Sequence, residues 1–169
     1  DMKALLQDIK NHGLEPLSLS GHVDLTTERG VQGLKRRIDL AKNLGVNIVN
    51  TGTGEAETAA AKEKFFENIA ELSKYAQAKE VVIALETHGG LTGTGEDCPA
   101  AMRRINSSWV RINYDPANVI YYRGVRPEED IKTVVDYIHH VHIKDQKGGK
   151  GVYDFPPIGE GDIDFGKLF

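Results

Sequence analysis

Apolar residues recur along the chain with two alternating periods, and this alternation predicts helices and strands in turn. Apolar positions three and four residues apart, closed by glycines such as Gly13 and Gly45, are typical of amphipathic helices. Short, continuously apolar runs between them are typical of strands buried on both faces, as in parallel sheets. We expect helices over 2–12, 26–44, 56–78, 100–105 and 128–137, and strands over 14–23, 46–50, 81–86, 110–114 and 138–143.

Strands that alternate with helices predict right-handed βαβ crossovers, which leaves a closed (β/α) barrel or an open doubly wound sheet. No Gly-x-Gly-x-x-Gly motif follows the first strand, so a dinucleotide-binding fold is not indicated. A barrel brings residues from consecutive strands around one central mouth. A complete barrel has eight strands and about 250 residues, whereas this chain has 169 residues. We therefore predict one α/β domain over 1–169, a (β/α)8 TIM barrel that is incomplete.

Three consecutive predicted strands end close to a residue that can bind a metal. Glu86 ends one strand, Asp115 follows the next, and His142 lies near the end of the third. Side by side and parallel, these strands would bring the three side chains together at one end of the sheet. Two carboxylates and an imidazole suit Mn²⁺, Mg²⁺, Co²⁺ or Zn²⁺ with positions left open for a substrate. The sequence thus predicts a divalent metal site formed by these three residues.

The segments around these residues resemble a known family, the sugar isomerases and epimerases with a xylose-isomerase-like barrel, which also includes endonuclease IV and inosose dehydratase. The resemblance rests on four motifs in order, namely ALETHG at 84–89, NYDPAN at 113–118, HVHIKD at 140–145 and PIGEGDIDF at 157–165. It implies that the chain corresponds to barrel strands three to seven. It also implies that a fourth metal ligand, a Glu on strand eight, lies beyond Phe169.

The activities of this family imply a function for this chain. Glu86 would be both a metal ligand and a catalytic acid/base group that takes a proton from the carbon beside a carbonyl, through an enediolate. We therefore expect a divalent-metal-dependent isomerase or epimerase of a sugar, sugar phosphate or cyclitol. Two alternatives stay open. One is an inosose-type dehydratase, and the other is a non-catalytic carbohydrate-binding protein on a degenerate barrel.

Side-chain alternation along the strands extends the expected site, because residues two apart share a face. His88 shares the face of Glu86, and Lys144 shares the face of His142. Both are expected to contact the hydroxyls or a phosphate of the substrate. His140 would lie one layer deeper, packed inside the barrel or orienting a ligand.

Further positions are expected to reach the same mouth. His22 lies near the end of the first predicted strand, and Asn118 stands where many epimerases carry a substrate-contacting His. We expect both to contact the substrate. For Asp145 and Glu160, on the loop after the last strand, a substrate contact and a loop-fixing hydrogen bond are equally compatible with the sequence.

Composition excludes several classes of partner. The formal net charge is -4 and the pI about 5.9, so no basic footprint for nucleic acid is present. A single cysteine, Cys98, excludes an intrachain disulfide framework, and no apolar run approaches the roughly 20 residues that span a bilayer. We expect a small-molecule sugar substrate and no membrane or nucleic acid. A cytoplasmic location is expected, although a chain that begins at Asp1 leaves a removed signal peptide open.

The DNA-repair branch of the family is disfavoured by two departures. Endonuclease IV needs a His three residues after the strand-six Asp, where this chain has Asn118. It also needs an Asp-x-His before the Gly-Glu-Gly loop, where this chain reads Tyr153-Asp154-Phe155. These departures favour a single-metal sugar enzyme.

An unclosed set of five parallel strands would leave two sheet edges with unpaired backbone groups. We therefore expect a homo-oligomer or an association with the remainder of the barrel.

Overall fold

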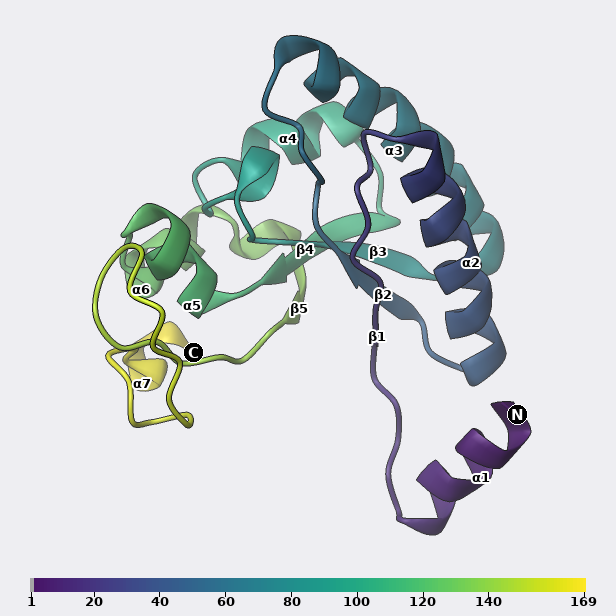
Figure 1. Cartoon of the computed structure of the whole chain (residues 1–169), viewed down its shortest axis with the longest axis horizontal. Coiled ribbons are helices and arrows are strands. Elements are labelled where there is room, and N and C mark those ends of the chain that lie inside the picture. The colour runs from purple at the N-terminus through teal and green to yellow at the C-terminus, as the bar shows by residue number, and fades with distance from the viewer. Residues whose placement is uncertain (1) are drawn as a thin grey trace.

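Five strands form one parallel sheet in the computed structural model, which describes residues 2–169 (Figure 1). The strands are β1 (Leu19–Ser20), β2 (Ile48–Thr51), β3 (Val82–Glu86), β4 (Val110–Tyr114) and β5 (Ile138–Val141). Each strand pairs with the next one along the chain, in the order β1-β2-β3-β4-β5. A doubly wound sheet would reverse its strand order, whereas a barrel keeps it. The barrel arrangement predicted from the sequence is therefore the one observed.

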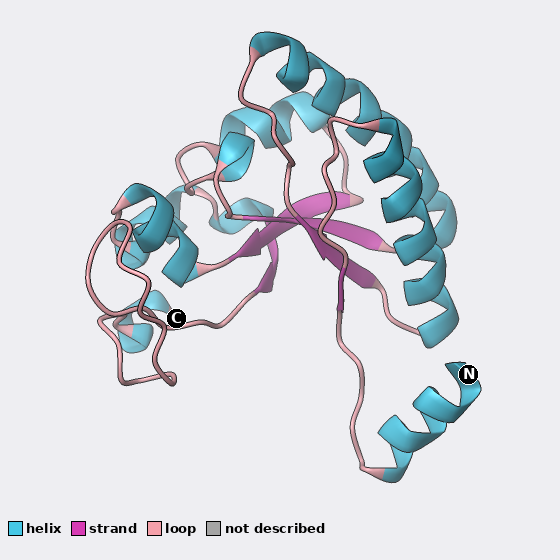
Figure 2. Ribbon diagram, in the orientation of Figure 1, coloured by secondary structure: helices cyan, strands magenta, loops and turns pink. Residues whose placement is uncertain are grey.

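The principal helices lie against one side of this sheet, and α1 stands away from it at the end of an extended segment (Figure 1, Figure 2). The α-helices are α1 (Met2–Asn11), α2 (Glu28–Leu44), α3 (Ala59–Lys79), α4 (Cys98–Ile105), α5 (Pro116–Asn118), α6 (Pro127–Asp130) and α7 (Phe165–Leu168). Shorter turns are 3-10 helices at Gly90–Thr92, Ile131–Thr133 and Val135–Tyr137 and a π-helix at Val119–Arg123. None of the helices within residues 2–169 is long and apolar enough to cross a bilayer.

Local caps and a shared core explain the two long helices. Thr27 and Thr58 accept hydrogen bonds from the backbone N–H groups of Gly30 and Ala61 and so begin α2 and α3. Gly45 ends α2 with φ 73°, a left-handed conformation that suits glycine. The inner faces of both helices pack on the outward side chains of the strands. This core includes Leu34, Ile38, Phe65, Leu72, Ile83, Leu85 and Ile112, all fully buried.

Two predicted elements differ strongly in extent from the observed ones. The strand expected over 14–23 is reduced to β1, because only Leu19 and Ser20 lie opposite β2; Leu14 and Leu17 are 63% and 74% exposed. The helix expected over 128–137 breaks after α6 into short 3-10 turns. Thr133 donates its hydroxyl to the carbonyl of Asp130, and such side-chain bonds compete with the helical backbone.

The pairing of β4 with β5 contains a register shift. Ile112 pairs with Ile138, but Asn113 pairs with His140, so that His139 is an extra residue in β5. Such a bulge re-aims the side chains that follow it. The predicted strand 138–143 ends at Val141 in the structure.

Candidate metal centre

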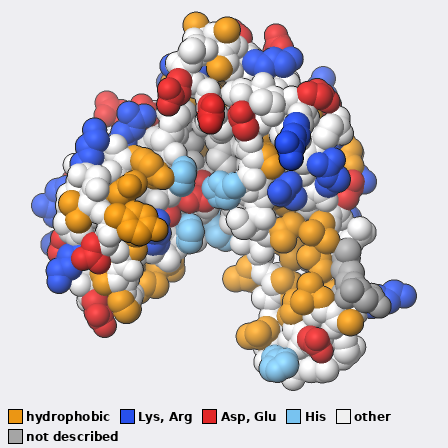
Figure 3. All heavy atoms as spheres, in the orientation of Figure 1, with side chains coloured by type: hydrophobic (Ala, Val, Ile, Leu, Met, Phe, Trp, Pro, Cys, Tyr) orange, Lys and Arg blue, Asp and Glu red, His pale blue; other side chains and the backbone are white. Residues whose placement is uncertain are grey.

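The carboxyl ends of the strands meet at a cavity of about 520 Å³. Histidine side chains gather in this hollow in the space-filling view (Figure 3). Seven of the residues singled out from the sequence line the cavity: His22, Glu86, His88, Asn118, His140, His142 and Lys144. Asp115, the remaining predicted metal ligand, is not among the lining residues and is fully buried. The predicted convergence of these side chains therefore occurs.

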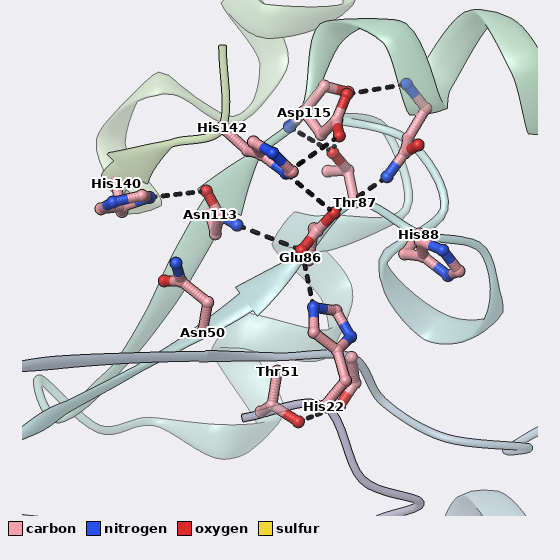
Figure 4. Close-up of polar contacts among 12 residues, drawn as sticks. His22, Asn50, Thr51, Glu86, Thr87, His88, Asn113, Asp115, His140 and His142 are labelled. Carbon is pink, nitrogen blue, oxygen red and sulfur yellow. Dashed lines mark hydrogen bonds and ion pairs between the residues drawn. The ribbon is translucent and has the colours of Figure 1, made fainter. Parts of the chain in front are cut away.

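Glu86, the last residue of β3, is at the centre of the site and is 4% exposed (Figure 4). Its Oε2 accepts hydrogen bonds from His22 Nε2 at 2.9 Å and Asn113 Nδ2 at 3.3 Å. Its Oε1 accepts from Asn118 Nδ2 at 3.0 Å and His142 Nδ1 at 3.4 Å. Each carboxylate oxygen thus has two donors from separate segments of the chain.

These hydrogen bonds decide the charge of Glu86. Burial by itself raises the pKa of a carboxyl group, but the hydrogen bonds from His142 and His22 outweigh it and hold the pKa of Glu86 below its usual range. The pKa of His142 is raised in turn, chiefly by its hydrogen bond to Glu86. Glu86 is therefore ionised at neutral pH.

Asp115 follows β4 and is locked by its backbone and by one of its two carboxylate oxygens. Its N–H donates to Thr87 Oγ1 at 2.8 Å, and its Oδ1 accepts from the N–H of Asn118 at 2.9 Å. Its Oδ2 is buried and has no hydrogen-bond partner among the described residues. Burial raises the pKa of Asp115 to about 6. A buried carboxylate oxygen without a donor is costly unless a cation or proton compensates it.

The three predicted ligands form a compact donor set. One ligand atom each from Glu86, Asp115 and His142 lies within 4.8 Å of the others. His142 Nδ1 is 3.3 Å from the unpartnered Oδ2 of Asp115, and the His142 side chain is 53% exposed. Two oxygens and a nitrogen beside an open cavity suit a divalent cation that keeps positions free for a substrate. The residues present therefore fit the metal that the sequence predicted.

A layer of side chains below the ligands supports Glu86. His140 Nδ1 lies 2.9 Å from Asn113 Oδ1, and Asn113 in turn donates its amide to Glu86. Asn113 is fully buried, and burial lowers the pKa of His140. His140 thus lies where alternation placed it, one layer deeper than His142, in an orienting position.

Two further residues face the open side of the cavity. His88 Nε2 lies 3.0 Å from the hydroxyl of Tyr122. Lys144 Nζ donates to Asn118 Oδ1 at 3.1 Å. The amide of Asn118 therefore links Glu86 to Lys144, a bridging position that its motif did not predict.

Two features of the site were not predicted from the sequence: the presence of Asn50 in the cavity and the hydrogen bond from Asn113 to Glu86. Asn50 lines the cavity from β2, is 8% exposed, and its Oδ1 has no hydrogen-bond partner among the described residues. In register Asn50 lies opposite Ala84, two residues before Glu86, and so shares its face. Alternation could have found Asn113, two residues before Asp115, but Asn50 required the pairing of β2 with β3.

The loop after β5 is fixed by Asp145. Its carboxylate accepts hydrogen bonds from the backbone N–H groups of Gln146, Gly159, Gly161 and Ile163, and it is 1% exposed. The sequence left two roles open for Asp145, a substrate contact and a loop-fixing hydrogen bond, and the structure shows the loop-fixing hydrogen bonds. The side chain of Glu160 is exposed.

We expect Asp145→Ala to lower the free energy of unfolding by about 2–4 kcal/mol, because four backbone N–H groups, two of them buried, lose a charged acceptor. Urea denaturation measures this change. Asp154→Ala, an exposed aspartate in the same loop, is the matched control and should change stability by less than about 0.5 kcal/mol. Equal effects of the two substitutions would contradict the assigned position of Asp145.

Comparison with known proteins places this geometry in a family. No curated protein matches the sequence. A xylose isomerase domain protein from Planctomyces limnophilus has a similar structure, with a TM-score of 0.86 and 19% identity over 99% of this chain and 69% of that one. An L-ribulose 3-epimerase is similar at a TM-score of 0.78 and 21% identity, over 99% of this chain and 61% of that one.

A third similar structure was solved with magnesium. This xylose isomerase-like TIM barrel protein from Mycobacterium smegmatis gives a TM-score of 0.82 and 21% identity, over 99% of this chain and 65% of that one. The chain thus spans about two thirds of the length of such proteins, which agrees with an incomplete barrel of five strands. The family model of the xylose isomerase-like TIM barrel matches residues 1–169, the whole chain, and the protein therefore belongs to this family.

Proposed function

We propose that the protein is a divalent-metal-dependent sugar isomerase or epimerase that moves a proton next to a carbonyl through an enediolate. The observation that carries this proposal is the grouping of Glu86, Asp115 and His142 at an open cavity, with one buried oxygen of Asp115 unpartnered. An L-ribulose 3-epimerase and a magnesium-bound protein among the similar structures support the same class.

Glu86, Asp115 and His142 would hold the cation. A divalent ion held there would polarise carbonyl and hydroxyl oxygens and so make the neighbouring C–H more acidic. Glu86 is ionised and can accept that proton and return it to the neighbouring carbon or to the other face. His22 and Asn113 hold its Oε2, so the carboxylate keeps one orientation during the transfer.

Other cavity residues have free capacity for substrate hydroxyls. Asn50 Oδ1, buried and unpartnered, can accept a hydrogen bond from a sugar hydroxyl. The Lys144 ammonium has three donors, of which one is used by Asn118. Polar groups of this kind fix the orientation of a small ligand.

Calorimetric titration with Mn²⁺ tests the metal site. We expect binding by the chain and at least about a tenfold loss of affinity in His142→Ala, because removing an orienting residue alone costs about 10–100-fold. His139→Ala is the matched control, since His139 is the exposed extra residue of β5, and it should bind as the unchanged chain does. Equal affinity in all three proteins would contradict the proposed centre.

The reaction is tested by incubating the Mn²⁺-loaded protein with a panel of ketoses in D₂O. Replacement of the hydrogen beside the carbonyl by deuterium, followed by NMR, is the expected result for proton transfer through an enediolate. Loss of a water molecule from the sugar, seen by mass spectrometry, would favour the dehydratase instead. Metal-dependent sugar binding without exchange or water loss would favour a carbohydrate-binding protein.

A further inference from the structure

A long irregular loop runs over residues 145–163, between β5 and α7. Loops of this length without secondary structure are usually functional or disordered. This one is ordered from within, because the Asp145 carboxylate fixes its two ends and the Gln146 amide fixes its first turn. Gln146 is fully buried, and its Nε2 donates to the carbonyls of Lys147, Gly149 and Val152. The loop therefore has one fixed conformation to present.

What the loop presents is a group of aromatic rings. Phe155 and Tyr153 lie 5.0 Å apart between ring centroids, and both lie against Tyr121 of the π-helix, at 5.6 and 6.1 Å. We call these three residues the aromatic wall. Tyr153 is 83% exposed despite these contacts. Tyr121 and Phe155 are half-buried behind it, so the loop holds the Tyr153 ring in solvent on an aromatic support, where it is free to pack against a ligand.

The aromatic wall is continuous with the proposed substrate cavity. Lys144 lines the cavity, and its Nζ lies 3.9 Å from the centroid of the Phe155 ring. Tyr122 packs on Tyr121 with ring centroids 4.9 Å apart and contacts His88, another cavity residue. Hydrophobic side chains also lie directly beside the histidines of the hollow in the space-filling view (Figure 3). A ligand that extends past Lys144 would therefore meet aromatic ring faces.

The side chains of the aromatic wall are suited to bind a second sugar ring. Aromatic faces pack against the apolar C–H face of a pyranose, and tyrosine hydroxyls offer hydrogen bonds to its edge. A phosphoryl group would instead need several cations or backbone N–H donors, and Lys144 is the one cation that the contacts above place against the wall. We infer that the aromatic wall binds the second ring of a substrate in which the reacting keto-sugar is linked to another sugar. This inference rests on the proposed function of the cavity.

The experiment compares D-fructose with three keto-disaccharides that carry a second ring on different hydroxyls: turanose, lactulose and isomaltulose. Dissociation constants are measured by NMR titration of the Mn²⁺-loaded protein. We expect at least one disaccharide to bind about three- to tenfold more tightly than fructose, the range of one aromatic stacking contact. Tyr153→Ala should remove that preference and leave fructose binding unchanged.

Ile158→Ala is the matched control, because Ile158 is an exposed residue of the same loop outside the wall. It should keep the preference, and circular dichroism should show both variants folded. The inference would be overturned if fructose and all three disaccharides had equal dissociation constants, or if none of them bound. A preference that survives Tyr153→Ala would also overturn it. The same holds if Tyr153→Ala changes self-association, measured by sedimentation, but not sugar binding.

Failure of this inference is separable from failure of the proposed function. Deuterium exchange with fructose but no disaccharide preference would overturn the wall and leave the reaction standing. A disaccharide preference that depends on Tyr153, without deuterium exchange in any sugar, would support sugar binding by the aromatic wall and contradict the proposed reaction.

Discussion

Asp115→Asn is expected to have two opposite effects: loss of Mn²⁺ binding and a gain of stability in the metal-free protein at pH 8. The reason is that Asp115 is fully buried and its Oδ2 has no hydrogen-bond donor; the ion-pair contact with His142 Nδ1 at 3.3 Å only partly offsets the cost of burying its charge, since its pKa is still raised. Asparagine keeps the shape and the oxygen that accepts from Asn118 but carries no charge. We expect a gain of about 1–3 kcal/mol, since each pKa unit corresponds to about 1.4 kcal/mol.

The sign and the pH window follow from the raised pKa of Asp115, which is about 6 instead of 3.8. A carboxyl group whose pKa is raised by folding favours the folded state at low pH, and this contribution is lost as pH rises from 3.8 to about 6. The advantage of the asparagine variant should therefore be absent near pH 4, grow up to pH 6 and stay constant above it. The lowered pKa of Glu86 acts in the opposite direction in both proteins, whereas the part of the raised pKa of His142 that comes from Asp115 is lost in the variant.

Urea denaturation in the presence of a chelator, at pH 4, 6 and 8, measures the stability, and calorimetry with Mn²⁺ measures the binding. We expect the Mn²⁺ affinity of the variant to fall by at least about 100-fold, because a ligand and not only its support is removed. Asp136→Asn, a change at an exposed aspartate, is the control and should alter neither quantity. If the stability of the variant relative to the unchanged chain were lower at pH 8 than at pH 4, the charge of Asp115 would not be costly in the metal-free protein and the prediction would be wrong.

Glu86→Gln is expected to lower the rate of deuterium exchange by about 10²–10⁴-fold, the usual contribution of a general acid or base. The amide cannot accept the proton from carbon. Its NH₂ group also replaces one oxygen that receives two hydrogen bonds, from His22 and Asn113 or from Asn118 and His142. We therefore also expect a loss of about 1–3 kcal/mol in stability.

Exchange is followed by NMR at saturating Mn²⁺ and ketose, so that weaker binding does not mimic a slower step. Glu67→Gln, at an exposed glutamate of α3 that does not line the cavity, is the control and should exchange at the original rate. If Glu86→Gln retained more than a tenth of the rate, the proton would have to be taken by a different group, and the proposed role of Glu86 would be wrong.

The order of the elements and the grouping of the candidate metal ligands could be predicted from the sequence because both depend on local patterns. The spacing of apolar residues predicted α2 and α3 closely, and Gly45 predicted the end of α2. The carboxyl ends of parallel strands lie at the same edge of a sheet whatever the register of the strands. Glu86, Asp115 and His142 were found in this way.

What could not be predicted depends on partners distant in the sequence. The strand expected over 14–23 is short because β2 offers pairing to only two of its residues. The importance of Asn50 comes from its register with Ala84, and the loop-fixing position of Asp145 from N–H groups 14 to 18 residues later. No periodicity within a single segment contains this information.

The extra residue in β5 also affects how the chain is compared with its relatives. Ile138 and His142 are separated by three residues here because His139 is inserted at the register shift. In a relative whose fifth strand pairs regularly, one residue fewer would separate the corresponding positions. A sequence alignment that forbids gaps inside strands would therefore place Val141 against that relative's metal-binding histidine and score the site as lost.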